Sequence, residues 1–89
     1  MNAIITVVGT DKVGIIAKVS AFLAERYINI EDISQTVLSG NFVMMMMVSL
    51  GSCSIALEDL KKELTGLGES LNVSISLMHE KVFSTMHRI

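Results

Sequence analysis

Two glycines near the N-terminus have the spacing of a loop that could bind phosphate. Gly9 and Gly14 are separated by four residues within the segment Val7 to Val19, "VVGTDKVGIIAKV". A nucleotide-binding P-loop requires Lys and then Ser or Thr directly after its second glycine. Ile15 and Ile16 occupy these positions, and neither side chain can bind a phosphate or Mg²⁺. What remains is a helix N-terminus whose exposed backbone N–H groups could meet an anion.

The residues that could carry catalysis or hold a metal are few and scattered. His79 and His87 could share a metal ion if the tail folds back, but solvated or capping roles are the simpler interpretation. Glu31 and Asp32 are neighbours on a predicted strand, so their side chains should point to opposite faces and cannot act together. Cys53 cannot form an internal disulfide, which fits a reducing cytoplasm. We therefore predict a cytoplasmic protein without catalytic residues, metal or cofactor.

Composition excludes several classes of function. The net charge is −2 and aromatic residues make up 4% of the chain, which argues against a nucleic-acid partner. The longest apolar run, "FVMMMMV", is far shorter than a membrane span, and the N-terminus lacks the pattern of a secretion signal. With 51% hydrophobic residues in 89, the chain has more apolar surface than it can easily bury alone. This excess predicts a homodimer or a larger homo-oligomer.

Two periodicities predict the elements that must position the loop. The β-branched run at 3–8 predicts a strand, and apolar residues spaced three and four apart predict a helix from Ile15 with Asp11 as its N-cap. Asn29 to Leu38 predicts a second strand, and Ser39 to Asn41 predicts a hairpin turn. The helical stripe consists of Ile15, Ile16, Val19, Phe22, Leu23 and Tyr27.

The second half of the chain repeats this alternation. A third strand at 42–50 has apolar residues on both faces, so we expect it to be covered on both sides; the pattern leaves open which methionines face the core. Leucines at helical spacing from Leu57 to Leu71 predict a second helix, which Gly66 and Gly68 should end. Residues 72–78 alternate between apolar and polar, which predicts a half-buried last strand.

The element order βαββαβ predicts an α+β fold of the ferredoxin-like type, a four-stranded antiparallel sheet with two helices on one face. Apolar residues at helical spacing in the tail, 80–89, predict a short C-terminal helix that docks on the open face of the sheet or on a partner chain. This fold supports unrelated functions, so the site residues must decide. A copper chaperone would need a Cys-x-x-Cys motif in the first loop, and an RNA-recognition domain would need stacking aromatics on the third strand.

The segment Val7 to Ile33, "VVGTDKVGIIAKVSAFLAERYINIEDI", resembles the ACT domain. The signature of that family is a strand, a polar loop ending Asp/Asn-x-Pro-Gly, an amphipathic helix, and Gly-x-Asn-Ile opening the second strand. The matching residues are Asp11 and Gly14 in the loop and Asn29 and Ile30 in the second element. Two residues depart from the pattern, because Val13 replaces the usual Pro and Tyr27 stands where the family usually has Gly.

The resemblance extends beyond this segment. The element order matches from Asn2 to Met78, which implies a single ACT domain at 1–89 with a core at 2–78 and a docking tail at 80–89. The whole chain, including its "MHRI" ending, is similar to the small stand-alone ACT proteins of the UPF0237 type. These in turn look like the N-terminal half of the glycine-cleavage transcriptional repressor.

The resemblance implies a non-catalytic regulatory module that binds a small amino acid at a homodimer interface and signals through a partner protein. A ligand carboxylate would lie against the helix N-terminus, Asp11 would pair with a ligand ammonium, and the Asn29 amide would donate and accept hydrogen bonds. The ligand-binding residues implied are Thr10, Asp11, Lys12, Val13, Gly14, Asn29 and Ile30.

Each of these residues also has a purely structural interpretation. Asp11 could simply cap the helix, Asn29 could be a turn residue, and Gly14 could only permit helix–sheet packing. The alternative functions are an assembly module without a ligand, or a small metal-binding or enzymatic protein that uses the histidines.

Overall fold

The structure is a computed structural model of the 89-residue chain, and it describes residues 2–10, 14–51 and 56–79. Cys53 and the predicted C-terminal helix at 80–89 lie outside the described residues. The elements are β1 (Asn2–Gly9), α1 (Ile15–Glu25), β2 (Asn29–Leu38), β3 (Asn41–Ser49), α2 (Leu57–Leu71) and β4 (Ser74–His79).

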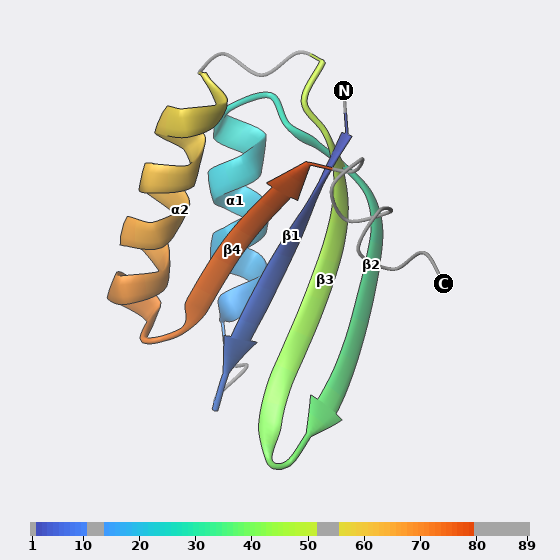
Figure 1. The fold of residues 1–89 in the computed structure, drawn as a ribbon, viewed down its shortest axis with the longest axis vertical. Coiled ribbons are helices and arrows are strands. Elements are labelled where there is room, and N and C mark those ends of the chain that lie inside the picture. The colour runs from blue at the N-terminus through green and yellow to red at the C-terminus, as the bar shows by residue number, and fades with distance from the viewer. Residues whose placement is uncertain (1, 11–13, 52–55, 80–89) are drawn as a thin grey trace.

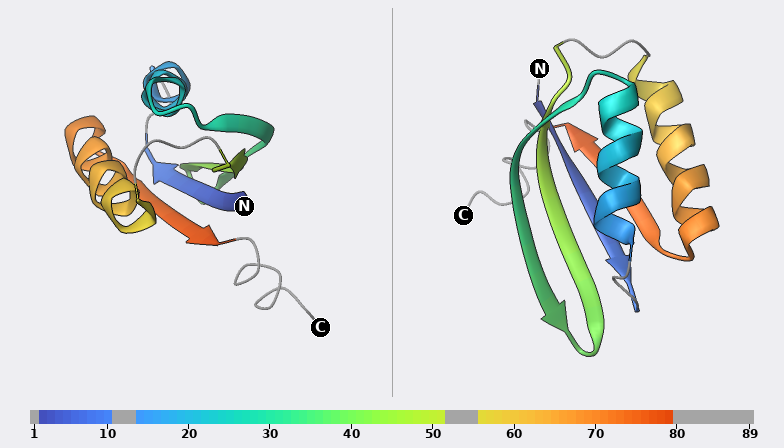
Figure 2. Two further views of the ribbon diagram at one scale, coloured as in Figure 1. Left: turned by 90° about the horizontal axis from the view of Figure 1, so that it is seen from above. Right: turned by 180° about the vertical axis from the view of Figure 1, so that it is seen from behind.

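The four strands form one antiparallel sheet in the order β2-β3-β1-β4. Both helices pack on the same face of this sheet and leave the other face open (Figures 1 and 2). This arrangement confirms the predicted ferredoxin-like fold. The end of the β2–β3 hairpin projects beyond the two helices, so β2 is an edge strand with little cover (Figure 1).

The core forms where the alternating pattern of the strands meets the apolar stripes of the helices. Ala3, Ile5 and Val7 of β1 are fully buried beneath the helices. The helical residues that cover them are Ile15, Val19 and Leu23 from α1 and Leu60 and Leu64 from α2. Tyr27, predicted as part of the α1 stripe, lies beyond the helix end and is 70% exposed, so that prediction was wrong.

The methionine strand has one buried face and one half-buried face. Met44 and Met46 are 0% exposed and belong to the core, whereas Met45 and Met47 alternate with them on the open face of the sheet. The pairing of Met46 with Ile5 fixes this register. The structure therefore identifies which methionines face the helices, a question that the apolar run alone left open.

Both ends of α1 are formed by backbone conformation rather than by a capping side chain. Gly14, with φ of 76°, is the N-cap, so the prediction that Asp11 holds this position was wrong; Asp11 itself lies outside the described residues. At the other end, Tyr27 N–H donates to Ala24 O and Ile28 N–H donates to Leu23 O. This pair of hydrogen bonds is a Schellman motif, which places Tyr27 in the left-handed conformation with φ of 59°.

The helix α2 continues through the two glycines that were expected to end it. It reaches Leu71 and is closed by Asn72, whose φ of 59° is the left-handed conformation that asparagine tolerates. Gly68 is buried against β4, and a Cβ built on it would lie 2.8 Å from the carbonyl oxygen of Val73. This glycine therefore allows close packing of helix on strand, while a Cβ on Gly66 would meet nothing within 4 Å.

Candidate functional site

The loop between β1 and α1 lies at one end of the sheet, and the structure describes two of its five predicted ligand-binding residues. Thr10 and Gly14 are both exposed, while Asp11, Lys12 and Val13 lie outside the described residues. The Gly14 carbonyl accepts the first hydrogen bond of the helix, from Lys18 N–H at 3.0 Å. A Cβ on Gly14 would meet nothing within 4 Å in this chain, so its glycine is explained here by the positive φ.

The N-terminus of α1, from Gly14 onward, has the properties of an anion site. The N-cap makes no side-chain capping hydrogen bond, and the first turn contains no acidic residue. Unpaired N–H groups and the helix dipole favour a negative group at such a position. A carboxylate bound here would gain roughly 0.3–1 kcal/mol from the dipole.

The second part of the predicted site, Asn29 and Ile30, opens β2. Asn29 is exposed, and its Nδ2 donates to Oε2 of Glu31 at 3.3 Å. Ile30 is half-buried and packs against the core, so its side chain serves the fold. A register shift between Ile30 and Asp32 makes Glu31 a bulge, and the strict alternation expected for Glu31 and Asp32 is broken at that point.

Within one chain these two parts of the site are far apart. Gly9 pairs with Phe42, which pairs with Val37, so the loop leaves the sheet at the hairpin end. Asn29 pairs with Ser49, which pairs with Asn2 at the other end of β1. The eight residues of β1 span about 24 Å at about 3.4 Å per residue. A single copy therefore does not bring the loop and Asn29 together.

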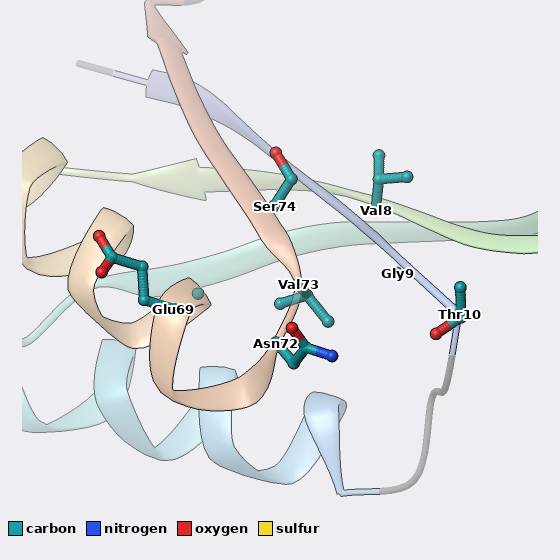
Figure 3. A pocket seen from close by; sticks show the side chains of 8 residues that line it. Val8, Gly9, Thr10, Glu69, Asn72, Val73 and Ser74 are labelled. Carbon is teal, nitrogen blue, oxygen red and sulfur yellow. The ribbon is translucent and has the colours of Figure 1, made fainter.

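A shallow pocket of about 470 Å³ lies beside the loop (Figure 3). The Thr10 hydroxyl and the Asn72 carboxamide point toward each other across it, while the Glu69 carboxylate points away (Figure 3). Val73 lies beside Asn72 (Figure 3), and a Cβ on Gly9 would come within 2.5 Å of Val73 Cγ1. Asn72 was missed from the sequence, although an asparagine directly after a helical pattern is a recognised signal for a left-handed helix end.

Arg26 joins the two helices through an ion pair. Its Nε donates to Glu63 Oε1 at 2.6 Å, and its Nη1 donates to the Phe22 carbonyl at 2.9 Å. The guanidinium also lies 3.6 Å from the centre of the Phe22 ring. Because these contacts already occupy the cation, it ties the end of α1 to α2, and we assign it a structural role.

The other functional classes find no assembled site in the described part of the chain. Among residues 2–10, 14–51 and 56–79, no group of three His, Cys, Asp or Glu side chains is placed to hold a metal ion. His79 lies on β4, and His87 falls outside these ranges, so their sharing of a metal is not tested. Neither described helix has the length and apolarity to span a membrane.

Comparison with known proteins gives one consistent family. A family model described as ACT domain matches residues 2–78. A UPF0237 protein of Listeria innocua is 47% identical over 89 residues, which cover all of both chains. An ACT domain protein from Streptococcus pneumoniae superposes with a TM-score of 0.84 at 47% identity, over 93% of each chain. A structure assigned as a glycine cleavage system transcriptional repressor has a TM-score of 0.76 at 26% identity, over 85% of this chain and 44% of that one.

Proposed function

The chain belongs to the ACT domain family and to its UPF0237 group, and from this we propose that it is a regulatory protein that binds a small amino acid between two copies of itself. ACT domains are typically regulatory and ligand-binding modules. The likeness to a structure assigned as a glycine cleavage system transcriptional repressor supports a regulatory role. In this proposal the protein acts by presenting its ligand-bound state to a partner protein.

The observation that carries the proposal is the position of the two half-sites relative to the edge strand β2. Among residues 2–10, 14–51 and 56–79, no strand lies beside the outer side of β2, and its ten residues offer backbone groups for further pairing. If β2 of a second copy adds in antiparallel orientation with the two strands fully overlapping, its Asn29 lies opposite Leu38. That is the sheet end where Gly9 and the loop leave the first copy. The loop of the first copy and Asn29 of the second are then separated by three strand spacings, about 14 Å, rather than by the length of β1.

The charges of β2 favour this antiparallel arrangement over a parallel one. Glu31 and Asp32 lie near the start of the strand, and residues 33–38 are uncharged. Parallel pairing would place both carboxylates beside their own symmetry copies, which is destabilising. Antiparallel pairing places them beside the uncharged end of the partner strand instead. An uncharged segment without Lys or Pro also lacks the usual protection against edge pairing.

The composite site has complementary groups for an α-amino acid. The α1 N-terminus of one copy would bind the carboxylate, and the Asn29 amide of the other would donate and accept hydrogen bonds. Asp11 is the residue we propose for the ligand ammonium, on the strength of its type and place in the sequence. The alternative is an assembly module whose loop stays empty, and the binding experiment below separates the two.

A thermal-shift screen of the twenty amino acids tests the proposal directly. A ligand present at a hundred times its Kd should stabilise the folded protein by about 2.7 kcal/mol. For a chain of this length, that free energy raises Tm by about 10 °C or more. If no amino acid shifts the melting temperature while the protein sediments as a dimer, the assembly module is the better function.

Asn29→Ala should weaken binding of the amino acid found in the screen without unfolding the protein. The variant removes one or two hydrogen bonds of about 0.5–1.5 kcal/mol each, which corresponds to a several-fold to hundredfold rise in Kd by calorimetry. Gly14→Asn should weaken binding as well, because asparagine tolerates the positive φ but adds a side chain toward the ligand. Thr65→Ala, an exposed change on α2, is the control. Unchanged affinity in both site variants would contradict the proposed site.

Docking of the C-terminal segment stays a prediction, because residues 80–89 lie outside the described residues. The apolar residues Val82, Phe83 and Met86 should lie against the half-buried open face of the sheet or a partner chain. Deletion of residues 82–89 should then lower the melting temperature or loosen the oligomer. Sedimentation and thermal unfolding of the truncated chain measure both effects, and no change in either would show that the segment does not dock.

A further inference from the structure

Tyr27 occupies a backbone position that is unfavourable for its residue type. Its φ of 59° lies in the left-handed region, where a bulky L-residue is a true outlier. At the end of α2 the same two hydrogen bonds, from Asn72 N–H to Glu69 O and from Val73 N–H to Gly68 O, surround an asparagine. Asparagine and glycine take this conformation at little cost, and tyrosine does not. The fold of one copy therefore gives no reason for a tyrosine here.

The Tyr27 side chain also gains little from its own chain. It is 70% exposed, although its neighbour Ile28 is buried against the core. A residue whose backbone is strained and whose aromatic ring is exposed to solvent is typical of a contact surface. Tyrosine suits such a surface because it combines a large apolar face with a hydroxyl group.

After Tyr27, the two most exposed large apolar residues show where that surface lies. Val37 is 65% exposed and Leu38 is 61% exposed, and both belong to the far end of β2. In an antiparallel pair of β2 strands, the start of one strand faces the end of the other. Tyr27 lies two residues before β2, within about 7 Å of its start. The exposed tyrosine of one copy and the exposed hairpin end of the other thus meet at each end of a two-fold interface.

We infer that Tyr27 is a contact residue of the interface between two copies of this chain, with its ring against the partner's Val37, which lies on the helix face of the sheet because it pairs with the buried Phe42. This inference rests on the edge pairing in the proposed function, and it does not depend on the ligand. The unfavourable φ of Tyr27 then destabilises the isolated copy, and burial of the aromatic ring in the dimer offsets this destabilisation. Interface hot spots are enriched in tyrosine for this reason.

The tyrosine can report on its own environment. It is the single tyrosine in a chain without tryptophan, so emission excited at 280 nm comes from this side chain alone. Acrylamide quenching should be strong in dilute protein, where the ring is exposed. It should fall about twofold or more across the concentration range in which sedimentation shows dimer formation. A quenching constant that does not change across that range would overturn the inference.

Variants provide the second measurement. The Tyr27→Asn variant introduces a residue that tolerates the left-handed backbone conformation but removes the aromatic ring. It should raise the Kd of the dimer at least about tenfold. Tyr27→Phe should stay within about threefold of the parent. Val8→Ala is the matched control, since Val8 is also an exposed apolar residue but lies on β1. Equal loss from Tyr27→Asn and Val8→Ala, or no loss from Tyr27→Asn, would refute the contact.

The outcomes separate this inference from the proposed function. A dimer that depends on Tyr27 but binds no amino acid supports the contact and contradicts the ligand. A dimer that binds an amino acid and is indifferent to Tyr27→Asn contradicts the contact alone. A wild-type chain that sediments as a monomer at all concentrations contradicts the edge pairing and the contact together.

Discussion

Met46→Glu should unfold the protein at neutral pH, whereas Met45→Glu should leave the isolated fold largely intact. Met46 is 0% exposed and pairs with Ile5 and Ile33 in the middle of the sheet. An unpaired carboxylate at this position costs several kcal/mol even after the surroundings relax. A protein of this size has a total stability of about 5–15 kcal/mol, so the loss removes most of it.

The pH dependence of Met46→Glu provides an internal check on this mechanism. Burial disfavours the charged form, so the pKa of the introduced glutamate is raised in the folded state above its ordinary value of about 4.3. The folded state then binds more protons than the unfolded state, and stability rises as pH falls toward that value. Circular dichroism at pH 7 and about pH 5, each compared with the parent, should show partial recovery of folded protein at the lower pH.

Met45→Glu is the matched control because it changes the same residue type one position away. Met45 is half-buried on the open face, where its neighbours across the sheet are Thr6 and Ser34. A carboxylate there can reach solvent, so the expected cost within one chain is about 1 kcal/mol or less. A large loss at Met45 with little loss at Met46 would contradict the register of β3. Dissociation of the oligomer by Met45→Glu alone would show that a second chain covers the open face.

The β3 strand also shows what a sequence pattern can and cannot decide. Seven consecutive apolar residues predict a strand, but an unbroken run has no alternation and therefore does not reveal which residues face the helices. Partner strands supply that information, because the pairing of Met46 with Ile5 places both on the helix side. The start of α1 and both ends of β2 were predictable, since the periodicity changes abruptly at Ile15 and at Asn29 and the turn residues follow Leu38.

The candidate site was only partly predictable for a different reason. Asn29 and the loop were identified from the family resemblance, but they lie at opposite ends of one chain, and no local pattern encodes how two copies meet. Tyr27 was noted as a departure from the family pattern, whereas its backbone conformation became visible only in the Schellman motif. A site shared between two chains is a property of their packing, and sequence periodicity reports only the packing within one.

Gly68→Ala should destabilise the protein and Gly68→Val should do so severely, although both residues favour helices more than glycine does. The added Cβ would lie 2.8 Å from the Val73 carbonyl oxygen and 3.2 Å from Ile75 Cγ1. The carbonyl belongs to the backbone at the helix end, where Val73 N–H donates to Gly68 O at 2.9 Å, so it cannot retract without breaking that end. Overpacking costs about 1–3 kcal/mol and opposes a gain in helix propensity of about 1 kcal/mol.

We therefore expect Gly68→Ala to lose about 1–2 kcal/mol net and Gly68→Val to lose about 3 kcal/mol or more in urea unfolding. Gly66 is the matched control two residues earlier in the same helix, where a Cβ meets nothing within 4 Å. Gly66→Ala should gain about 0.5–1 kcal/mol, because it restricts the unfolded chain and favours the helix. The opposite signs of the two alanine substitutions separate packing from propensity. If Gly68→Ala stabilises the protein as much as Gly66→Ala does, α2 does not pack this closely against the start of β4.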